Sequence, residues 1–435
     1  MNRHQKAVLR FLALSHEQIA RDLCDLVRIP ATNPYSGDAN PAGEAAAQDF
    51  LERHLRKIGC ATQRVPVPSD IYRRAGILGP RNRSWTGREN LVAEYRFGKG
   101  PGPVIVLNAH ADTVGVSDYE GNPFSGKREG DVIHGRGASD CKSGMIAGLY
   151  AIRALLESGA ALRGRVIFES VVDEECNGAG AGTLACCLGG TLGAYCIVID
   201  GAAGCVYTGC QGVATVEISV RGRAAHGSTG GVSALEKVLM LKKTLDHLGR
   251  ERRRRYPQCL INVGVLRAGI APWNVPNRGW LAANINYAYE EAARAEAAGH
   301  GFGGTLVRKH FEQLLAKTVQ RDEWLRQNPP DVEWIKDLPP FRMEDADRER
   351  ECGQLLKAVK SGFALAWSRQ PRFIELHAWA DASHLARIGR MAVVGMGAGE
   401  PGTSHTSQEW NRVSNVRNTA AAAALSVLEL MKHAD

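Results

Sequence analysis

Histidine and carboxylate side chains stand where several apolar runs of this 435-residue chain end. The run at residues 104–107, for example, is followed closely by His110 and Asp112. The residues placed in this way, or in a glycine-rich turn beside such a run, are His110, Asp140, Glu174, Glu175, Asp200 and His405. Imidazole nitrogens and carboxylate oxygens are ligands that zinc and similar divalent cations take in proteins. The pattern therefore indicates hydrolytic metal chemistry.

The apolar runs themselves predict buried strands of an α/β sheet. They lie at residues 104–107, 166–172, 196–199 and 391–395. A glycine-rich turn at 135–140 precedes a predicted helix at 145–157, and the loop at 399–406 holds His405. Ligands of open α/β sheets bind beyond the carboxyl ends of the strands, so we expect these turns to meet at one sheet edge.

Each of these residues, taken alone, has a structural explanation. A histidine after a strand is usually a hydrogen-bonded turn residue, and a Glu-Glu pair is usually part of a solvated loop. Asp140 could cap a helix, and Asp200 could form a turn. Only the repeated placement of ligand-type residues at strand ends favours a metal site.

The motifs around these residues resemble those of the co-catalytic zinc amidohydrolases, which include acetylornithine deacetylase, succinyl-diaminopimelate desuccinylase, aminoacylase and glutamate carboxypeptidase. They read H-A-D-T-V at 110–114, G-R-G-A-S-D-C-K-S-G at 135–144, D-E-E at 173–175 and H-T-S-Q-E at 405–409. The resemblance spans nearly the whole chain. It implies an α/β fold with a zinc-peptidase-like mixed sheet flanked by helices, and an inserted α+β sandwich that serves as a lid and dimerisation domain.

The resemblance also implies a metal-binding role for five residues. Asp140 would bridge two divalent cations. His110 and Asp200 would complete the shell of one cation, and Glu175 and His405 the shell of the other. Zinc is the expected metal, with cobalt or manganese as substitutes, because ligand type alone does not choose between them.

Two further carboxylates would be catalytic. Asp112 would hold the far ring nitrogen of His110 and so fix its tautomer. Glu174 would be the general base. Two cations lower the pKa of a water molecule that they share, and this bridging water would be the nucleophile. Glu174 would take its proton and then pass it to the leaving amine.

The chain changes character near Tyr207, where an alternating strand pattern begins. Strands are predicted at 213–220, 259–267, 279–287 and 331–335, and helices at 232–248 and 306–327. This order suggests an α+β sandwich inserted into the larger α/β domain. We therefore expect a catalytic domain at 1–206 and 341–435, ending in a helix at about 415–432, and a lid domain at 207–340.

Several residues outside the metal motifs are expected to contact the substrate. By the resemblance, His226 would reach the active site of a partner subunit and stabilise the oxyanion of the tetrahedral intermediate. The alternative for His226 is a plain turn histidine. Asn274 lies in an Asn-Val-Pro turn like the turn that contacts substrate in relatives.

Two departures from the family pattern bear on the substrate. Asn286 stands where many relatives have an arginine that holds a substrate carboxylate, and an amide cannot replace that charge. Arg278 or Arg267 could supply the missing cation. Trp379 and Asp381, both expected to contact substrate, lie in a loop where relatives have glycines, and Trp379 adds bulk there. Both departures favour an unusual substrate, aromatic or unlike an amino acid.

Composition is that expected of a cytoplasmic enzyme with a small-molecule substrate. The chain is 44% hydrophobic and has no apolar run long enough to span a membrane. The apolar segment at 8–14 is broken by Arg10 and predicts a helix rather than a signal peptide. Eleven cysteines in a large chain favour reduced thiols. Cys141 and Cys176 lie beside the proposed site; we interpret them as packing residues, with metal ligation as the less favoured alternative, and their oxidation would disturb the site.

A net charge of +8 is modest for this length and does not indicate nucleic-acid binding. The densest basic block, at 250–255, follows a predicted helix, where cations suit the helix dipole. We interpret the block as a solvated helix end.

The sequence thus predicts a homodimeric, dinuclear metal-dependent amidohydrolase that cleaves a C–N bond in a small N-acyl amino-acid-like substrate. Two alternatives within enzymes remain: a dipeptidase or carboxypeptidase, and a hydrolytic deaminase of an aryl amine or amidine. A catalytically silent binding protein is the alternative outside enzymes. It is disfavoured because Glu174 and all five ligand-type residues are present.

Overall fold

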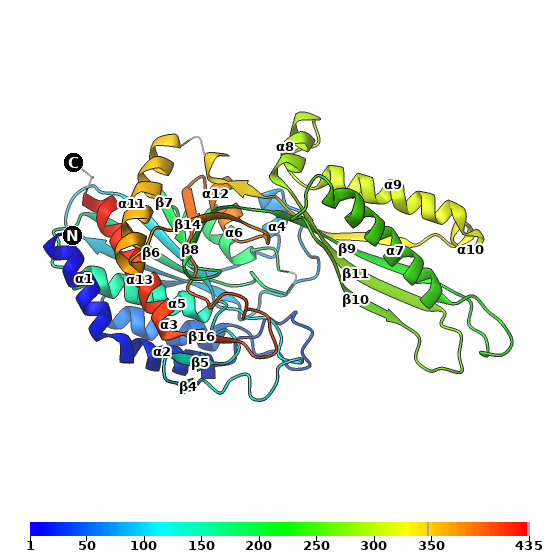
Figure 1. Ribbon diagram of the computed structural model, residues 1–435, viewed down its shortest axis with the longest axis horizontal. Helices are drawn as coiled ribbons and strands as arrows, with labels where there is room; N and C mark the ends of the chain where they lie inside the picture. The colour runs from blue at the N-terminus through cyan, green and yellow to red at the C-terminus, as the bar shows by residue number, and fades with distance from the viewer. Residues whose placement is uncertain (177, 346–347, 433–435) are drawn as a thin grey trace.

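The computed structural model describes residues 1–176, 178–345 and 348–432. It has a large mixed α/β part, which holds both chain ends, and a long arm that projects from it (Figure 1). The fold is the predicted one, a central mixed sheet flanked by helices. A second, smaller sheet with its own helices is inserted in the chain between strands of the central sheet.

The larger sheet has nine strands in the order β1-β2-β6-β3-β7-β15-β8-β13, with β14 paired to β8. The strands are β1 (Ala61–Pro66), β2 (Glu89–Phe97), β3 (Val104–His110), β6 (Gly164–Val171), β7 (Tyr195–Val198), β8 (Cys205–Cys210), β13 (Phe341–Arg342), β14 (Arg372–Leu376) and β15 (Ala392–Gly395). A three-stranded sheet of β4 (Lys127–Glu129), β5 (Val132–His134) and β16 (Trp410–Arg412) lies apart from it.

Alternate side chains of the central strands enter two different cores. Ile105 and Leu107 of β3 pack in the larger core, and Val106 between them packs in the core on the opposite face. The larger core is completed by α1 (Arg3–Leu14), α2 (His16–Arg28), α3 (Ala45–Lys57), α5 (Lys142–Leu156), α11 (Glu349–Trp367) and α13 (Val413–Lys432). The other face is covered by α4 (Ile71–Ala75), α6 (Ala181–Leu188) and α12 (Ala382–Arg387). Burial on both faces explains why these strands are nearly continuous apolar runs.

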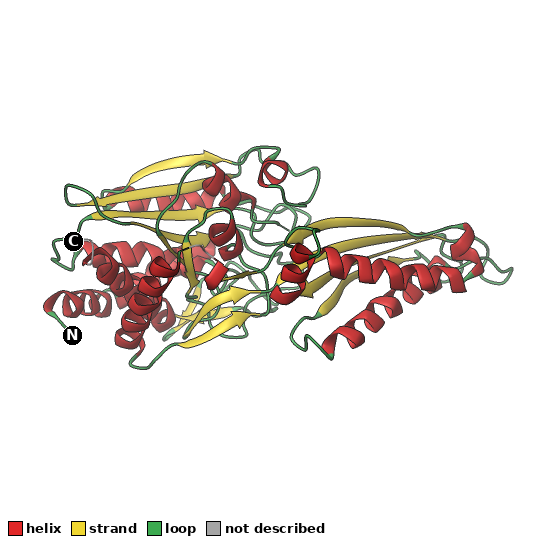
Figure 2. Ribbon diagram, turned by 90° about the horizontal axis from the view of Figure 1, so that it is seen from above, coloured by secondary structure: helices red, strands yellow, loops and turns green. Residues whose placement is uncertain are grey.

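The projecting arm is a four-stranded antiparallel sheet in the order β10-β11-β9-β12. Its strands are β9 (Gly212–Arg221), β10 (Ile261–Ala268), β11 (Arg278–Tyr287) and β12 (Asp331–Leu338). Its helices are α7 (Ala234–Arg253), α8 (Tyr289–Ala297), α9 (Thr305–Arg321) and α10 (Glu323–Gln327). The long helices α7 and α9 run side by side along one face of the sheet (Figure 2).

The division into residues 1–206, 207–340 and 341–435 stays a prediction. Strand β8 spans its first boundary and still belongs to the larger sheet, whereas the arm's own sheet begins at Gly212. Among the described residues, no helix is both long enough and apolar enough to cross a membrane.

The interpretation of residues 250–255 as a solvated helix end is wrong for Arg252. Helix α7 continues to Arg253 rather than ending at residue 248, and Arg252 is 5% exposed. Its guanidinium pairs with the Glu291 carboxylate at 2.5 Å and donates to the Asn286 carbonyl at 2.8 Å. A buried acid 39 positions away had no signal in the local sequence.

Candidate active site

The strand ends meet at one sheet edge, as the sequence predicted. Strand β3 is parallel to both β6 and β7, and β15 is parallel to β7. Their carboxyl ends therefore point the same way. His110 is the last residue of β3, and Asp200 comes two residues after β7. The turn that follows β6 carries Glu174 and Glu175.

Two groups of possible metal ligands share Asp140. One contains His110, Asp140, Cys141 and Asp200, and the other contains Asp140, Glu175 and His405, with the ligand atoms of each group within 4.8 Å of one another. The His110 Nε2 atom lies 3.0 Å from the Asp140 carboxylate and 3.8 Å from that of Asp200. On the other side, His405 Nε2 lies 2.9 Å from the Glu175 carboxylate and 3.5 Å from that of Asp140.

The electrostatics of the site suit a cation. The Glu175 carboxylate is the largest of the influences that raise the pKa of His405 to about 12. Burial raises the pKa of Glu175 to about 7, and burial also raises the pKa of Glu174 well above its usual value. Burial opposes ionisation of Asp140, yet His110 and His405 hold its pKa well below the usual range. Crowded buried carboxylates beside two imidazoles are a donor set that fits divalent cations.

The sequence analysis expected the Asp112 side chain to hold the far ring nitrogen of His110, but the Asp112 carboxylate has other partners. His110 Nδ1 lies 2.9 Å from the backbone carbonyl of Asp112 and 3.6 Å from its carboxylate. The carboxylate instead accepts hydrogen bonds from the backbone amides of Glu174 (3.3 Å) and Glu175 (3.1 Å). Asn33 Nδ2 donates to the same carboxylate at 2.7 Å. Asp112 thus ties the end of β3 to the turn that carries both glutamates.

Glu409 anchors the turn that carries Asp140. It is fully buried, and its Oε1 accepts from the amides of Ser139 (2.8 Å) and Asp140 (2.9 Å). Its Oε2 accepts from the amide of Gly137 (3.1 Å) and from Arg136 Nη1 (3.0 Å). One carboxylate therefore satisfies four donors of the glycine-rich turn and fixes the backbone next to the shared ligand.

A buried ion network holds the other turn. The Arg88 guanidinium pairs with Glu44 and lies 3.3 Å from the Asp173 carboxylate, which also accepts from the Tyr72 hydroxyl at 2.8 Å. Asp173 has a positive φ of 69°, a left-handed conformation that costs a non-glycine residue free energy and must be held by its surroundings. These contacts determine where the adjacent Glu174 and Glu175 project.

The sequence analysis missed these supporting residues. Asn33, Glu44 and Arg88 lie upstream of every motif that it used, and no local pattern marks them. Glu409 stands in the quoted H-T-S-Q-E motif, so its position was a usable signal.

Three predicted substrate or catalytic residues lie on the arm. His226 is exposed and forms an isolated bridge with Asn274. Asn274 and Arg278 line a hollow of about 1570 Å³, together with Arg221 and Arg267. No residue of the two ligand groups lines this hollow within the described part of the chain. A smaller hollow of about 480 Å³ opens beside His405.

The remaining predicted substrate residues lie where the arm joins the larger part. The Asn286 side chain donates to the carbonyl of His377 at 2.7 Å and to Gln211 at 3.3 Å. The indole of Trp379 packs against His384, with ring centroids 4.9 Å apart. Burial raises the pKa of Asp381 to about 7, although one of its oxygens accepts from the Thr183 hydroxyl at 2.7 Å.

Comparisons with known proteins agree with this architecture. A sequence model of peptidase family M20/M25/M40 matches residues 106–429. N-formyl-4-amino-5-aminomethyl-2-methylpyrimidine deformylase of Halalkalibacterium halodurans is 28% identical over 77% of each chain. Succinyl-diaminopimelate desuccinylase of Methylocella silvestris is 35% identical over 37% of this chain and 36% of its own.

Solved structures share the fold at low identity. Human carnosine dipeptidase 1 has a TM-score of 0.74 at 15% identity, over 98% of this chain and 99% of that one. A di-peptidase of Saccharomyces cerevisiae has a TM-score of 0.75 at 14% identity over the full length of both chains.

Proposed function

The chain belongs to peptidase family M20/M25/M40 and is a hydrolase of C–N amide bonds, and we propose that it cleaves a small N-acyl substrate at the cluster around Asp140. The observation that carries this proposal is the convergence of two ligand groups on Asp140, beside Glu174, at the carboxyl edge of the larger sheet. Both groups use ligand types that suit zinc.

We propose two divalent cations, with zinc as the resident metal and cobalt or manganese as substitutes. His110 and Asp200 would hold one, Glu175 and His405 the other, and Asp140 both. When bound, such cations lower the pKa of water and polarise the scissile carbonyl.

Glu174 is the proposed general base. Its neighbour Glu175 faces His405, and the amides of both residues are fixed by Asp112. Glu174 would accept a proton from the attacking water at a carboxylate oxygen and return it to the nitrogen of the leaving amine. Burial raises the pKa of Glu174, which suits a group that must both take up and release a proton.

His226 of the partner subunit is proposed to stabilise the developing oxyanion. Within one chain, His226 is exposed on the arm and lines neither hollow. The arm also carries much of the exposed apolar surface: Leu235, Leu239, Leu260, Leu266, Ile270 and Trp273. Its edge strand β10 has one free side. Edge strands and apolar patches of this kind favour association, so we propose a homodimer formed through the residue 207–340 domain.

The substrate class has two candidates. The first is an N-acyl amino-acid-like compound, for which Arg278 or Arg267 would hold the carboxylate. The second is an N-acyl amine without a carboxylate, and two observations favour it: the amide of Asn286 is bonded to backbone and Gln211, and a relative over 77% of the chain is named as a deformylase of a pyrimidine. Dipeptide cleavage and deamination of an aryl amine remain the alternatives.

We further propose a cytoplasmic location, which eleven unpaired cysteines support.

Incubation of the zinc-loaded protein with a mixed pool, followed by mass spectrometry, tests the proposal. The pool holds N-acyl amino acids, N-formyl aryl-methylamines, dipeptides and aryl amines, and Glu174→Gln serves as the blank. Deacylation of an N-acyl compound is expected. The identity of the cleaved compound decides between the two substrate candidates. Cleavage only of N-acyl compounds without a carboxylate would mean that Asn286, in place of an arginine, has changed the specificity. Consumption of dipeptides or aryl amines alone would overturn the N-acyl proposal.

A further inference from the structure

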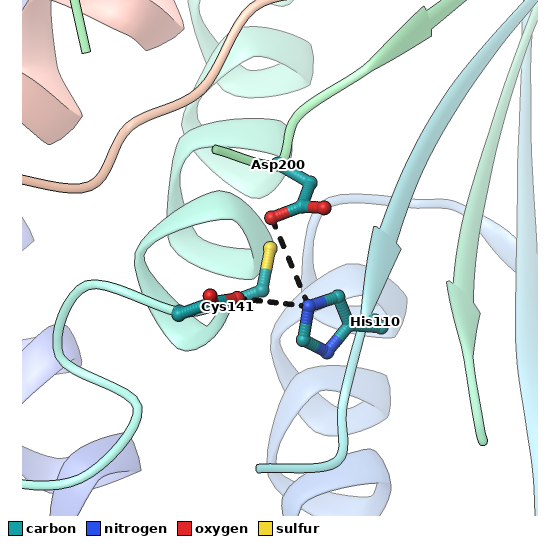
Figure 3. Close-up of side chains that lie close together, drawn as sticks. His110, Cys141 and Asp200 are labelled. Atoms are coloured by element: carbon teal, nitrogen blue, oxygen red, sulfur yellow. Dashed lines mark hydrogen bonds and ion pairs between the residues drawn. The ribbon is translucent and has the colours of Figure 1, made fainter. Parts of the chain in front are cut away.

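Cys141 lies inside the first ligand group rather than beside it. Its Sγ atom and the ligand atoms of His110, Asp140 and Asp200 all lie within 4.8 Å of one another. Cys141 begins the turn into α5, and its sulfur is on the side of Asp200 and the His110 ring (Figure 3). Building on the metal centre of the proposed function, we propose that Cys141 is the fourth protein ligand of the cation held by His110, Asp140 and Asp200.

The spacing of the four groups is close to that of a complete shell. Zinc bonds of about 2.0–2.3 Å in a tetrahedron place neighbouring ligand atoms roughly 3.3–3.7 Å apart. The His110 contacts, 3.0 Å to Asp140 and 3.8 Å to Asp200, bracket this range. With every pair within 4.8 Å, closing the shell around Sγ requires a shift of at most about 1 Å, which small side-chain rotations supply.

The Cys141 sulfur is buried between the start of α5 and the end of β7. The thiol is 1% exposed and donates to the Ile199 carbonyl at 3.1 Å. On the helix side, a Cβ atom at Gly144 would come within 2.7 Å of Sγ and 1.9 Å of the Ile199 oxygen. Helix α5 therefore packs directly against the end of β7 and holds the sulfur next to Asp200.

Coordination by Cys141 needs no oxidant or reductant. The S–H bond breaks heterolytically, the sulfur lone pair binds the cation, and the proton leaves to solvent. The hydrogen bond to Ile199 is given up in the same step. One additional proton is therefore released for each cation bound at this site.

The proposal makes the two metal positions unequal. The first group offers four protein ligands and the second offers three. Closed four-ligand shells are typical of tightly held zinc, whereas catalytic zinc keeps one position for water. A thiolate also shifts preference toward zinc, cobalt and cadmium and away from manganese. The first position would bind the tighter, thiophilic cation, and the open position would lie beside Glu175 and His405.

Titration of the metal-depleted full-length protein with Co²⁺ tests this inference by absorption spectroscopy. The expected result is a near-ultraviolet thiolate-to-cobalt charge-transfer band that grows with the first equivalent and not with the second. Cys141→Ser should lose the band and bind the first equivalent at least about tenfold more weakly, since even outer partners of metal ligands are worth that much. X-ray absorption of the zinc-loaded protein should show sulfur at about 2.3 Å.

Cys176→Ser is the matched control, because this second thiol adjoins Glu175 but belongs to neither ligand group. It should keep the band. The role of Cys141 would be overturned if the wild-type protein binds cobalt, as its visible absorption would show, and hydrolyses amides, yet has no charge-transfer band. That result would leave the proposed function standing. Failure to bind cobalt at all would remove both. The wild-type spectrum decides even if Cys141→Ser does not fold.

Discussion

Replacement of Glu409 by glutamine should destabilise the protein far more than its conservative chemistry suggests. In the wild type each carboxylate oxygen accepts two hydrogen bonds, from the Ser139 and Asp140 amides on one side and from Arg136 and the Gly137 amide on the other. A glutamine has a single acceptor oxygen. Whichever way it is oriented, two buried donors face its NH₂ group.

The magnitude follows from these contacts. A buried donor left without its acceptor costs about 1–3 kcal/mol, and the two together cost roughly 2–6 kcal/mol. Arg136 is 1% exposed, and removal of its buried charged partner independently predicts a cost of about 3–5 kcal/mol in stability. We therefore expect the free energy of unfolding to fall by about 3–5 kcal/mol. Because the Asp140 backbone rests on Glu409, metal affinity should also fall about 10–100-fold.

Urea unfolding followed by tryptophan fluorescence measures the stability, and competition with a chelating dye measures the metal affinity. Glu120→Gln is the control, since Glu120 is exposed and accepts from Gln408 beside the same loop. It should change stability by less than about 0.5 kcal/mol. If Glu409→Gln unfolds at the same urea concentration as Glu120→Gln, the anchoring role assigned to Glu409 is wrong.

Three other substitutions give sharp expectations. Arg252→Met leaves Glu291 buried without its partner and should cost about 3–5 kcal/mol in urea unfolding, whereas Arg253→Met, at an exposed position, should cost little; equal effects would contradict the buried pair. Burial raises the pKa of Glu169 to about 8. Between pH 4.5 and 8 the folded state therefore keeps a proton that the unfolded state has lost. As pH rises through this range, Glu169 lowers the free energy of unfolding by up to about 1.4 kcal/mol per pH unit. Glu169→Gln should remove that slope from the pH dependence of unfolding, and an unchanged slope would show that Glu169 is ionised in the fold. His226→Ala should lower kcat by about 10²–10³ with metal content unchanged, and unaltered kinetics would remove His226 from the active site.

The sequence predicted what local patterns encode. Apolar runs ending in His110 and Asp200 marked parallel strands, and their register places both side chains at the same edge. The glycine-rich turn ending at Asp140 marked the start of α5, and Gly144 in the first turn of this helix permits the close approach to the Ile199 carbonyl. These features depend on residues adjacent in the chain, which is why they are visible without a structure.

What the sequence did not reveal depends on distant partners. The Glu44–Arg88–Asp173 network joins three loops far apart in the sequence, and the burial of Arg252 depends on Glu291 in a different helix. The contact of His110 Nδ1 with the Asp112 carbonyl rather than its carboxylate depends on how the backbone leaves β3. Such pairings follow from tertiary packing, and a charged residue in a basic run is otherwise most often solvated.

Turnover and metal content of Glu174→Gln, measured on the same preparation, bear most closely on the proposed chemistry. The amide keeps the shape of the side chain but cannot accept the proton of water, so kcat should fall by at least about 10²–10⁴. Both metal positions should stay filled, because Glu174 belongs to neither ligand group. Undiminished hydrolysis by the metal-loaded variant would contradict the role of Glu174 as the base, and loss of metal would instead make it a ligand.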